Sequence, residues 1–234
     1  MSSEHLVVAV DGPSGSGKSS VSRAAATRLG VGYLDTGAMY RAVTWWCLEE
    51  GVDLDDRDAV AQAAREIPLV MGTEPAHASV QVSGREIEDA IRTTRVSEAV
   101  SKVATNTQVR PVLQQLQRDL MDEIATRTGG VVAEGRDITT VVAPDADVRV
   151  LLTASVEARL RRRSRELHGG DDAAAVAATR DQIVRRDEDD STVSDFMEAA
   201  DGVTLLDTSD LDFEQSVDAL VELVRSHAPA KVRG

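Results

Sequence analysis

The chain is 234 residues long, 42% hydrophobic and only 3% aromatic, with a net charge of −14 at pH 7. The negative charge argues against general binding to nucleic acids or to anionic membranes, because both call for a basic face. No apolar run approaches the roughly 20 residues that cross a bilayer, and the N-terminus lacks the basic and long apolar segments of a signal peptide, so we expect neither.

Short apolar runs followed by helical patterns recur along the chain. The runs do not alternate with polar residues, which is typical of parallel strands covered on both faces. With helices between them, they predict an α/β fold. The last helix is the clearest, because Asp212 and Gln215 form a capping-box pattern at its start. The predicted strands are residues 6–10, 31–35, 131–135, 148–154 and 202–209.

Two stretches interrupt this alternation. The first is a strand-rich insert in which Val80 and Val82 lead into a Ser83-Gly84 turn, as in a hairpin, and two helices follow it, the second opened by Pro111. The second is highly charged and poor in large apolar residues, which favours a mobile helical lid over core. We therefore expect a core at 1–65, 91–156 and 201–234, an insert at 66–90 and an arginine-rich lid at 157–200.

A phosphate-binding loop follows the first predicted strand. Its glycines allow backbone N–H groups to point at phosphate oxygens, and the next helix adds its positive N-terminal end. Lys18 is expected to reach the β- and γ-phosphates of ATP, and the Ser19 hydroxyl to hold Mg²⁺ shared with phosphates and water. The pattern G-x-x-x-x-G-K-[ST] is matched by Gly12, Pro13, Ser14, Gly15, Ser16, Gly17, Lys18 and Ser19, and Ser20 extends the predicted ATP site.

Three classes of protein use such a loop. A GTPase switch would need a guanine-reading N-K-x-D segment, and the sequence has none, since its one asparagine, Asn106, lies in ATNTQV. A motor or transporter ATPase usually has an apolar strand that ends in a clear aspartate, and the closest candidates, AEGRD and LLDTSD, are unconvincing. A small-molecule kinase needs a second anion pocket for the acceptor, which the rest of the chain supplies.

Two segments with arginines predict that acceptor pocket. LDTGAMYR places Asp35 and Thr36 at the carboxyl end of a strand and Arg41 about one helical turn later. AEGRD gives the same arrangement with Arg136 and Asp137 on another strand. Because ligands of parallel sheets bind at the carboxyl ends of strands, we expect both segments to face the phosphate loop. The predicted function is therefore phosphoryl transfer to a small anionic acceptor.

The chain resembles the bacterial cytidylate kinases along nearly its whole length. The segments that carry the resemblance are DGPSGSGKSS, LDTGAMYR, AIRT with VSKVAT and VRP, AEGRDITTVVAPDA, and VRRDEDD. The resemblance implies a P-loop NTPase-type parallel sheet of about five strands, with a monophosphate-binding insert and a helical lid. It also implies transfer of the ATP γ-phosphate to CMP or dCMP, with Mg²⁺, in pyrimidine nucleotide metabolism.

The resemblance further assigns roles to individual residues. Arg41 and Arg136 match the arginines that hold the acceptor phosphate, and Arg186 and Asp190 match a pair that closes over ribose and phosphate. The positions around the nucleoside are Thr36, Ser101, Arg110 and Asp137, and the arginines of the donor side are Arg159, Arg162 and Arg163. We expect catalysis to depend on Lys18, Arg136 and these donor-side arginines.

Cytosine recognition follows from hydrogen-bonding chemistry. The base presents an amino donor beside a ring nitrogen and a carbonyl that accept, so Asp137 can accept from the amine while Arg110 and Ser101 donate. Uracil has a carbonyl where that amine stands, which would leave a carboxylate unpaired in a buried site. We therefore expect the chain to prefer CMP over UMP.

Two positions depart from the family pattern. The family often has a further arginine where this chain has Val193, and a glycine where it has Thr139. Both departures bear on how the nucleoside is bound. The lone histidines, His5, His77, His168 and His227, show no metal-binding spacing.

Other readings of the sequence remain open at this point. A P-loop kinase could act on another small acceptor such as UMP or shikimate, and a nucleotide-sensing module could bind without turnover. The single Cys47 can form no internal disulfide, which suits a reducing compartment. We expect a cytoplasmic monomer that takes ATP and CMP or dCMP as substrates and has neither nucleic acid nor membrane as a partner.

Overall fold

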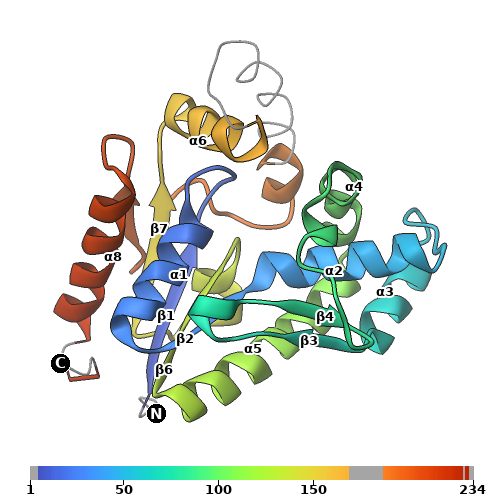
Figure 1. Ribbon diagram of the computed structural model, residues 1–234, viewed down its shortest axis with the longest axis horizontal. Helices are drawn as coiled ribbons and strands as arrows, with labels where there is room; N and C mark the ends of the chain where they lie inside the picture. The colour runs from blue at the N-terminus through green and yellow to red at the C-terminus, as the bar shows by residue number, and fades with distance from the viewer. Residues whose placement is uncertain (1–4, 169–186, 229, 232–234) are drawn as a thin grey trace.

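The computed structural model of the chain describes residues 5–168, 187–228, 230 and 231. Its centre is a sheet of five parallel strands in the order β2-β6-β1-β7-β8 (Figure 1). All five strands lie where the apolar runs predicted them, which confirms the predicted fold class. Their bounds are β1 Leu6–Asp11, β2 Gly32–Asp35, β6 Gly130–Gly135, β7 Val148–Thr153 and β8 Thr204–Asp207.

Helices cover both faces of this sheet. On one face, α1 (Lys18–Leu29) and α8 (Phe213–His227) pack on buried valines and leucines of β1, β7 and β6. On the other face, α2 (Thr36–Glu49) and α5 (Val109–Thr128) pack on residues such as Ala9 and Ala133. The predicted capping box of α8 is present, since Asp212 and Gln215 exchange side chain-to-backbone hydrogen bonds. Burial on both faces explains the unbroken apolar runs of the strands.

The insert forms a second, antiparallel sheet. Its strands are β3 (Leu69–Met71), β4 (Val80–Val82) and β5 (Arg85–Glu86), in sequential order, with the short helix η1 (Pro75–His77) between the first two. The predicted hairpin is confirmed, because Val82 pairs with Arg85 across a turn in which Ser83 and Gly84 both have positive φ, 52° and 75°. Val80 and Val82 are buried against α2 and the main sheet, so the insert shares the main core.

A helical layer stands beside the insert. It consists of α3 (Arg57–Glu66), the short η2 (Ala90–Arg92), α4 (Thr94–Ala104) and α5. Together with α2, these helices enclose a smaller apolar core around Tyr40, Val60 and Leu113. Pro111 is the third residue of α5, where its missing N–H breaks no helical hydrogen bond, so the predicted start of this helix is confirmed.

The segments that complete the molecule gather near the carboxyl ends of the strands. A π-helical turn, η3 (Ile138–Val142), follows β6, and α6 (Val156–His168) follows β7. Residues 187–191 are helical as well, whereas the middle of the expected lid, 169–186, lies outside the described residues. The described ends of the chain lie together at the opposite end of the molecule (Figure 1). Within the described part of the chain, no helix combines the length and apolarity needed to span a membrane.

Candidate active site

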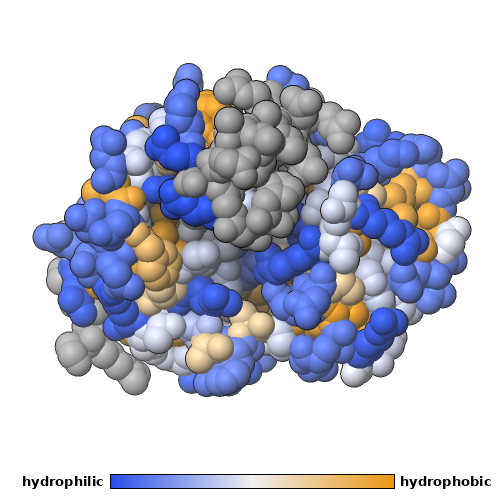
Figure 2. Space-filling view, turned by 45° about the horizontal axis from the view of Figure 1, so that its top comes forward, coloured by the Kyte–Doolittle hydropathy of each residue, from blue (hydrophilic) through white to orange (hydrophobic). Residues whose placement is uncertain are grey.

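The candidate active site is a cleft at the carboxyl ends of β1, β2 and β6. It contains a cavity of about 350 Å³ that the phosphate loop, the start of α2, the insert and the turn after β6 line together. The face shown in the space-filling view is mostly hydrophilic, with hydrophobic residues in separate patches (Figure 2). Arginines as well as carboxylates line this cavity, in a protein whose net charge is −14.

The phosphate loop has the curled backbone that its glycines predicted. Gly15 and Gly17 have φ values of 74° and 88°, and the N–H of Ser16 donates to the carbonyl of Pro13 at 3.3 Å. A Cβ on Gly15 would lie 2.8 Å from the carbonyl oxygen of Arg159, so this loop also touches α6. Lys18 is the first residue of α1, which aims the helix N-terminus into the loop. The residues of the loop that line the cavity are Ser14, Gly15, Gly17, Lys18, Ser19 and Ser20.

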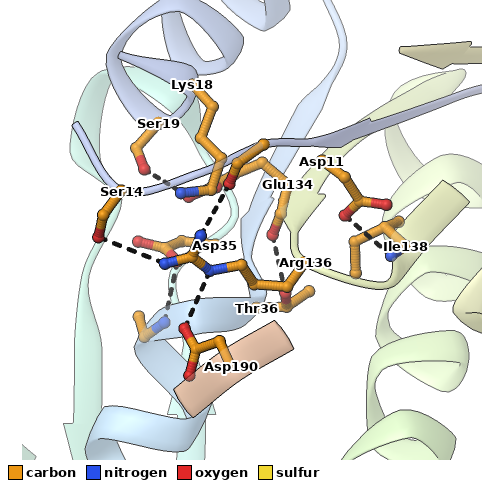
Figure 3. A network of polar contacts seen from close by, with 12 residues as sticks. Asp11, Ser14, Lys18, Ser19, Asp35, Thr36, Glu134, Arg136, Ile138 and Asp190 are labelled. Carbon is orange, nitrogen blue, oxygen red and sulfur yellow. Dashed lines mark hydrogen bonds and ion pairs between the residues drawn. The ribbon is translucent and has the colours of Figure 1, made fainter. Parts of the chain in front are cut away.

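A buried carboxylate sits directly beneath the loop. Glu134, the fifth residue of β6, accepts a hydrogen bond from Ser19 Oγ at 2.7 Å and lies 3.7 Å from Lys18 Nζ (Figure 3). Burial, and next the neighbouring carboxylate of Asp35, raise the pKa of Glu134 to about 7. Sequence reasoning missed Glu134, although an acidic residue at the end of the apolar run VVAE was a usable signal.

These oxygen atoms fit a magnesium ion. Mg²⁺ prefers hard oxygen ligands and is held by one or two carboxylates together with substrate phosphates and water. The Ser19 hydroxyl and the carboxylates of Glu134 and Asp35 supply such oxygens beside Lys18. Burial is the main cause of the raised pKa of Glu134, and the nearby carboxylate of Asp35 adds to it, so a cation bound between the two carboxylates would be stabilised.

The start of α2 brings the first predicted acceptor residues to the cleft. Thr36 Oγ1 donates to the carbonyl oxygen of Glu134 at 2.7 Å (Figure 3), which joins the start of α2 to β6. Arg41 is buried, lines the cavity, and donates to the Ile91 carbonyl at 3.0 Å and to Ser97 Oγ at 2.9 Å. Arg92, which sequence reasoning left without a role, lines the same cavity and lies 3.5 Å from Asp35.

A smaller cavity, about 40 Å³, holds the predicted base-reading pair. Arg110 Nη2 donates to Asp137 Oδ2 at 2.6 Å and to Ser194 Oγ at 2.9 Å. Gln114, one turn later on α5, donates to the same carboxylate oxygen at 2.7 Å. Gln114 follows Arg110 by four residues, so both donors lie on one face of the helix. This spacing is the feature of the sequence that could have identified Gln114 as a second partner of Asp137.

The linings of the two cavities show where the rest of the predicted nucleoside residues lie. Thr36, Asp137 and Asp190 line the smaller cavity, and so does Val193, the first departure from the family pattern. Ser101 lies on α4 and is not among the described residues that line either of these cavities. Its backbone carbonyl accepts hydrogen bonds from Thr105, and its expected contact with the base stays a prediction.

Thr139, the second departure, makes a buried contact that a glycine could not. Its hydroxyl donates to Asp11 Oδ2 at 2.6 Å, and its N–H donates to the same oxygen at 2.7 Å. The N–H of Ile138 donates to the other oxygen of Asp11 at 3.0 Å (Figure 3). Asp11 ends β1, where burial raises its pKa, so a carboxylate before the phosphate loop anchors the turn that follows Asp137.

Arg136 lies between the phosphate loop and residues 187–191. It donates to the Gly12 carbonyl at 3.2 Å and to Ser14 Oγ at 3.3 Å, and its Nε lies 3.1 Å from Asp190 Oδ2 (Figure 3). Its guanidinium also stacks 4.3 Å from the ring centroid of buried Phe196. The predicted acceptor arginine is thus held beside the donor loop.

The predicted donor-side arginines take different places on α6. Arg159 is buried and donates to the Ser14 carbonyl at 3.0 Å. Arg162 donates to the carbonyls of Ser16, Thr208 and Leu211 at 2.8, 2.6 and 3.2 Å, so its guanidinium ties the phosphate loop to the segment after β8. The side chain of Arg163 and the whole of Arg186 lie outside the described residues.

Comparisons with known proteins agree along nearly the whole chain. The family model described as cytidylate kinase matches residues 8–226. A protein named cytidylate kinase from Streptomyces griseus is 46% identical over 221 residues, covering 94% of this chain and 92% of its own. Another from Nocardia farcinica is 49% identical over 224 residues, covering 94% and 93%. The crystal structure of a sugar kinase from Janibacter covers 98% of this chain and 99% of its own with a TM-score of 0.52, and at 14% identity it shows likeness of fold alone.

The two lines of observation converge. The P-loop, the Arg110–Asp137 pair and the arginines around Ser14 occupy one end of a parallel sheet, and the family model and the similar proteins carry one family description. This chain belongs to the cytidylate kinase family.

Proposed function

We propose that this chain transfers the γ-phosphate of ATP to CMP or dCMP, producing ADP and CDP or dCDP. The observation that carries the proposal is the pairing of β1 with β6, in which Asp11 lies opposite Gly135. The phosphate loop follows β1 and the Arg136–Asp137 turn follows β6, so the two segments start next to each other. A donor bound at the loop and an acceptor bound at the turn would therefore face each other. Membership of the cytidylate kinase family supports the choice of acceptor.

The acceptor needs no general base in this proposal. The attacking atom is a phosphate oxygen of the monophosphate, and it is already mostly ionised at neutral pH because the second pKa of such a phosphate is near 6. The chain therefore has to align the two phosphates and neutralise the charge on the transferring group. Arg136 and Arg159 contact Ser14 of the loop, and Lys18 lies beside Glu134 beneath it, where the three cations can do both.

Magnesium, when bound with ATP, would supply positive charge to the phosphates. Ser19, Glu134 and Asp35 are the residues that would hold it, directly or through water. On the acceptor side, Arg41 and Arg136 are proposed to bind the monophosphate, with Thr36 beside them. Arg162, which lies under the loop, is proposed to keep its backbone in place.

Base recognition in this proposal rests on Asp137. Both of its described side-chain donors, Arg110 and Gln114, reach Oδ2. A carboxylate oriented in this way can accept a hydrogen bond from the amino group of cytosine, while Arg110 can donate to the base. The carbonyl of uracil at the same place would face a negative charge, so UMP should be the poorer substrate.

The test is a screen of common nucleoside monophosphates with MgATP, followed by ADP release in a coupled assay. We expect CMP and dCMP to have the highest kcat/KM. A higher kcat/KM for UMP or AMP would contradict the proposal and favour a kinase for another acceptor. Calorimetric binding of ATP and CMP without ADP release would favour a nucleotide sensor.

A further inference from the structure

A carboxylate of the chain occupies an anion site at the mouth of the phosphate loop. Asp187 Oδ1 accepts a hydrogen bond from the backbone N–H of Ser14 at 2.9 Å and another from Arg136 Nη1 at 3.0 Å. Its Oδ2 accepts from Arg159 Nη1 at 2.5 Å. Asp187 is only 6% exposed, so this is a buried and fully formed contact.

The partners of Asp187 are those that a phosphoryl group would choose. A backbone N–H of a phosphate loop and two guanidinium groups are the usual donors to phosphate oxygens. Arg136 and Arg159 together carry two positive charges, which the carboxylates of Asp187 and Asp190 balance. When Asp187 is displaced, Asp190 is the one described carboxylate left beside the two arginines, so the set regains a net positive charge that suits an incoming phosphate.

Arg136 has little hydrogen-bonding capacity left in this arrangement. Nε lies against Asp190, Nη1 donates to Asp187 and the Gly12 carbonyl, and Nη2 donates to Ser14 Oγ. A guanidinium has five N–H donors, and these contacts use four of them. A substrate phosphate can gain a bidentate grip on Arg136 only if a protein group gives way.

Arg159 points to the same conclusion from the donor side. Its Nη1 donates to Asp187 and to the Ser14 carbonyl, whereas its Nε is buried and has no hydrogen-bond partner among the described residues. A buried N–H without a partner is unfavourable. A polyphosphate that replaced Asp187 beside this guanidinium would bring further oxygens within reach of it.

We propose that Asp187 is a positioning residue that holds the anion site for the transferring phosphoryl group and leaves it when substrates bind. This proposal rests on the proposed function in assigning Arg136 to CMP and Arg159 to ATP. Because one carboxylate bridges both arginines, the first substrate must displace it, and the second substrate meets arginines already released. Asp187 thereby couples the two substrate sites, so that CMP and ATP each strengthen the binding of the other.

The experiment compares the wild-type chain with Asp187→Asn and with Glu188→Gln. Glu188 is the next residue, is exposed, and offers the same loss of one charge without the arginine contacts. Calorimetry measures binding of CMP alone, of a non-hydrolysable ATP analogue with Mg²⁺ alone, and of the analogue with CMP present. Melting temperatures of all three proteins establish that each is folded.

We expect CMP to raise the affinity of the wild-type chain and of Glu188→Gln for the analogue on the order of tenfold. Asp187→Asn should bind each substrate alone more tightly than the wild-type chain, and the effect of CMP on the analogue should disappear. Unchanged or weaker binding of the single substrates to a folded Asp187→Asn protein would overturn the proposal, as would an unaltered effect of CMP.

Turnover separates this proposal from the proposed function. A wild-type chain that binds CMP and the analogue but releases no ADP from MgATP and CMP would refute the kinase assignment. The binding measurements on Asp187→Asn would still decide the role of Asp187, because they depend only on the two arginines and the anions that they receive.

Discussion

Lys18 lines the cavity of the candidate active site, between the phosphate loop and a buried carboxylate. Its Nζ is 3.7 Å from Glu134 Oε2, which holds the ammonium group at the base of the cleft. Lys18→Ala should lower kcat by roughly three orders of magnitude, because charge neutralisation carries most of phosphoryl-transfer catalysis. The matched control is Lys231→Ala, which breaks an ion pair with Asp147 near the described ends of the chain. Equal kcat values for the two variants in the coupled assay would contradict the role of Lys18.

Asp137 is the residue on which the choice of base depends. In Asp137→Asn the side chain gains an N–H donor that suits the carbonyl of uracil and loses the charge that suits the amine of cytosine. The ratio of kcat/KM for CMP to that for UMP should fall by about 100-fold. The exposed Asp145 offers the control Asp145→Asn. An unchanged ratio in the Asp137 variant would refute base reading by this carboxylate.

Glu134 should make the stability of the ligand-free protein depend on pH. Its pKa is about 7 in the folded chain, against 4.5 for an unperturbed glutamate, so the folded state holds this proton more tightly than the unfolded state. The associated stability is present below pH 4.5 and is lost as pH rises toward 7. Between about pH 5 and pH 8, the free energy of unfolding should fall by about 3 kcal/mol relative to that of Glu134→Gln. Urea titrations without nucleotide or metal measure the free energy of unfolding of both proteins at each pH. If the two pH profiles were parallel, Glu134 would already be ionised at low pH and the prediction would be wrong.

At the scale of elements, the close contact of β6 with the start of α2 shapes the acceptor side. A Cβ on Gly135 would lie 2.4 Å from Thr36 Oγ1 and 2.9 Å from side-chain carbons of Ile138. Gly135→Ala should therefore reduce the free energy of unfolding by about 1–3 kcal/mol and raise the KM for CMP, because Thr36 and Arg136 would shift. Gly51→Ala is the control, since it strains a left-handed residue in open space. It should lower stability without changing KM, whereas equal KM values for the two variants would contradict the prediction.

The elements themselves were largely predictable, and the reason is burial. Val131, Val132 and Ala133 are all buried because helices cover both faces of β6, so the strand is an unbroken apolar run in the sequence. The Ser83-Gly84 turn was equally readable, because both residues have the positive φ that such hairpins require. These features depend on residues that are close together in the sequence, so they can be predicted from it.

The contacts of individual charged residues were not predictable in the same way. The stretch RLRRRSRE gives no sign that Arg159 reaches Asp187 while Arg162 binds carbonyls near β8. Glu134 was overlooked because its place beneath Ser19 follows from the packing of α1 on β6. Such partners come from distant parts of the chain, and only the folded topology brings them together.

At the scale of the whole molecule, we predict that the chain is a monomer. The exposed large apolar side chains include Val70 on β3, Leu205 on β8 and Phe213 on α8, which belong to different elements. A stable interface usually buries more than about 1,000 Å² of contiguous surface, and the net charge of −14 adds repulsion between copies. Sedimentation equilibrium should give a particle of 25.0 kDa. A particle of twice this mass would show that one of these patches is an interface.

The hydrogen bonds of Asp11 have a consequence for protein engineering. Three donors from Ile138 and Thr139 converge on this one side chain. The end of β1, before the phosphate loop, and the turn after Asp137 are therefore fixed relative to each other. A chimaera that borrowed the turn of a relative with glycine in place of Thr139 would lose one of the three donors to a carboxylate that is 1% exposed. Exchanges of acceptor specificity between family members should therefore transplant the end of β1 and the turn after β6 together.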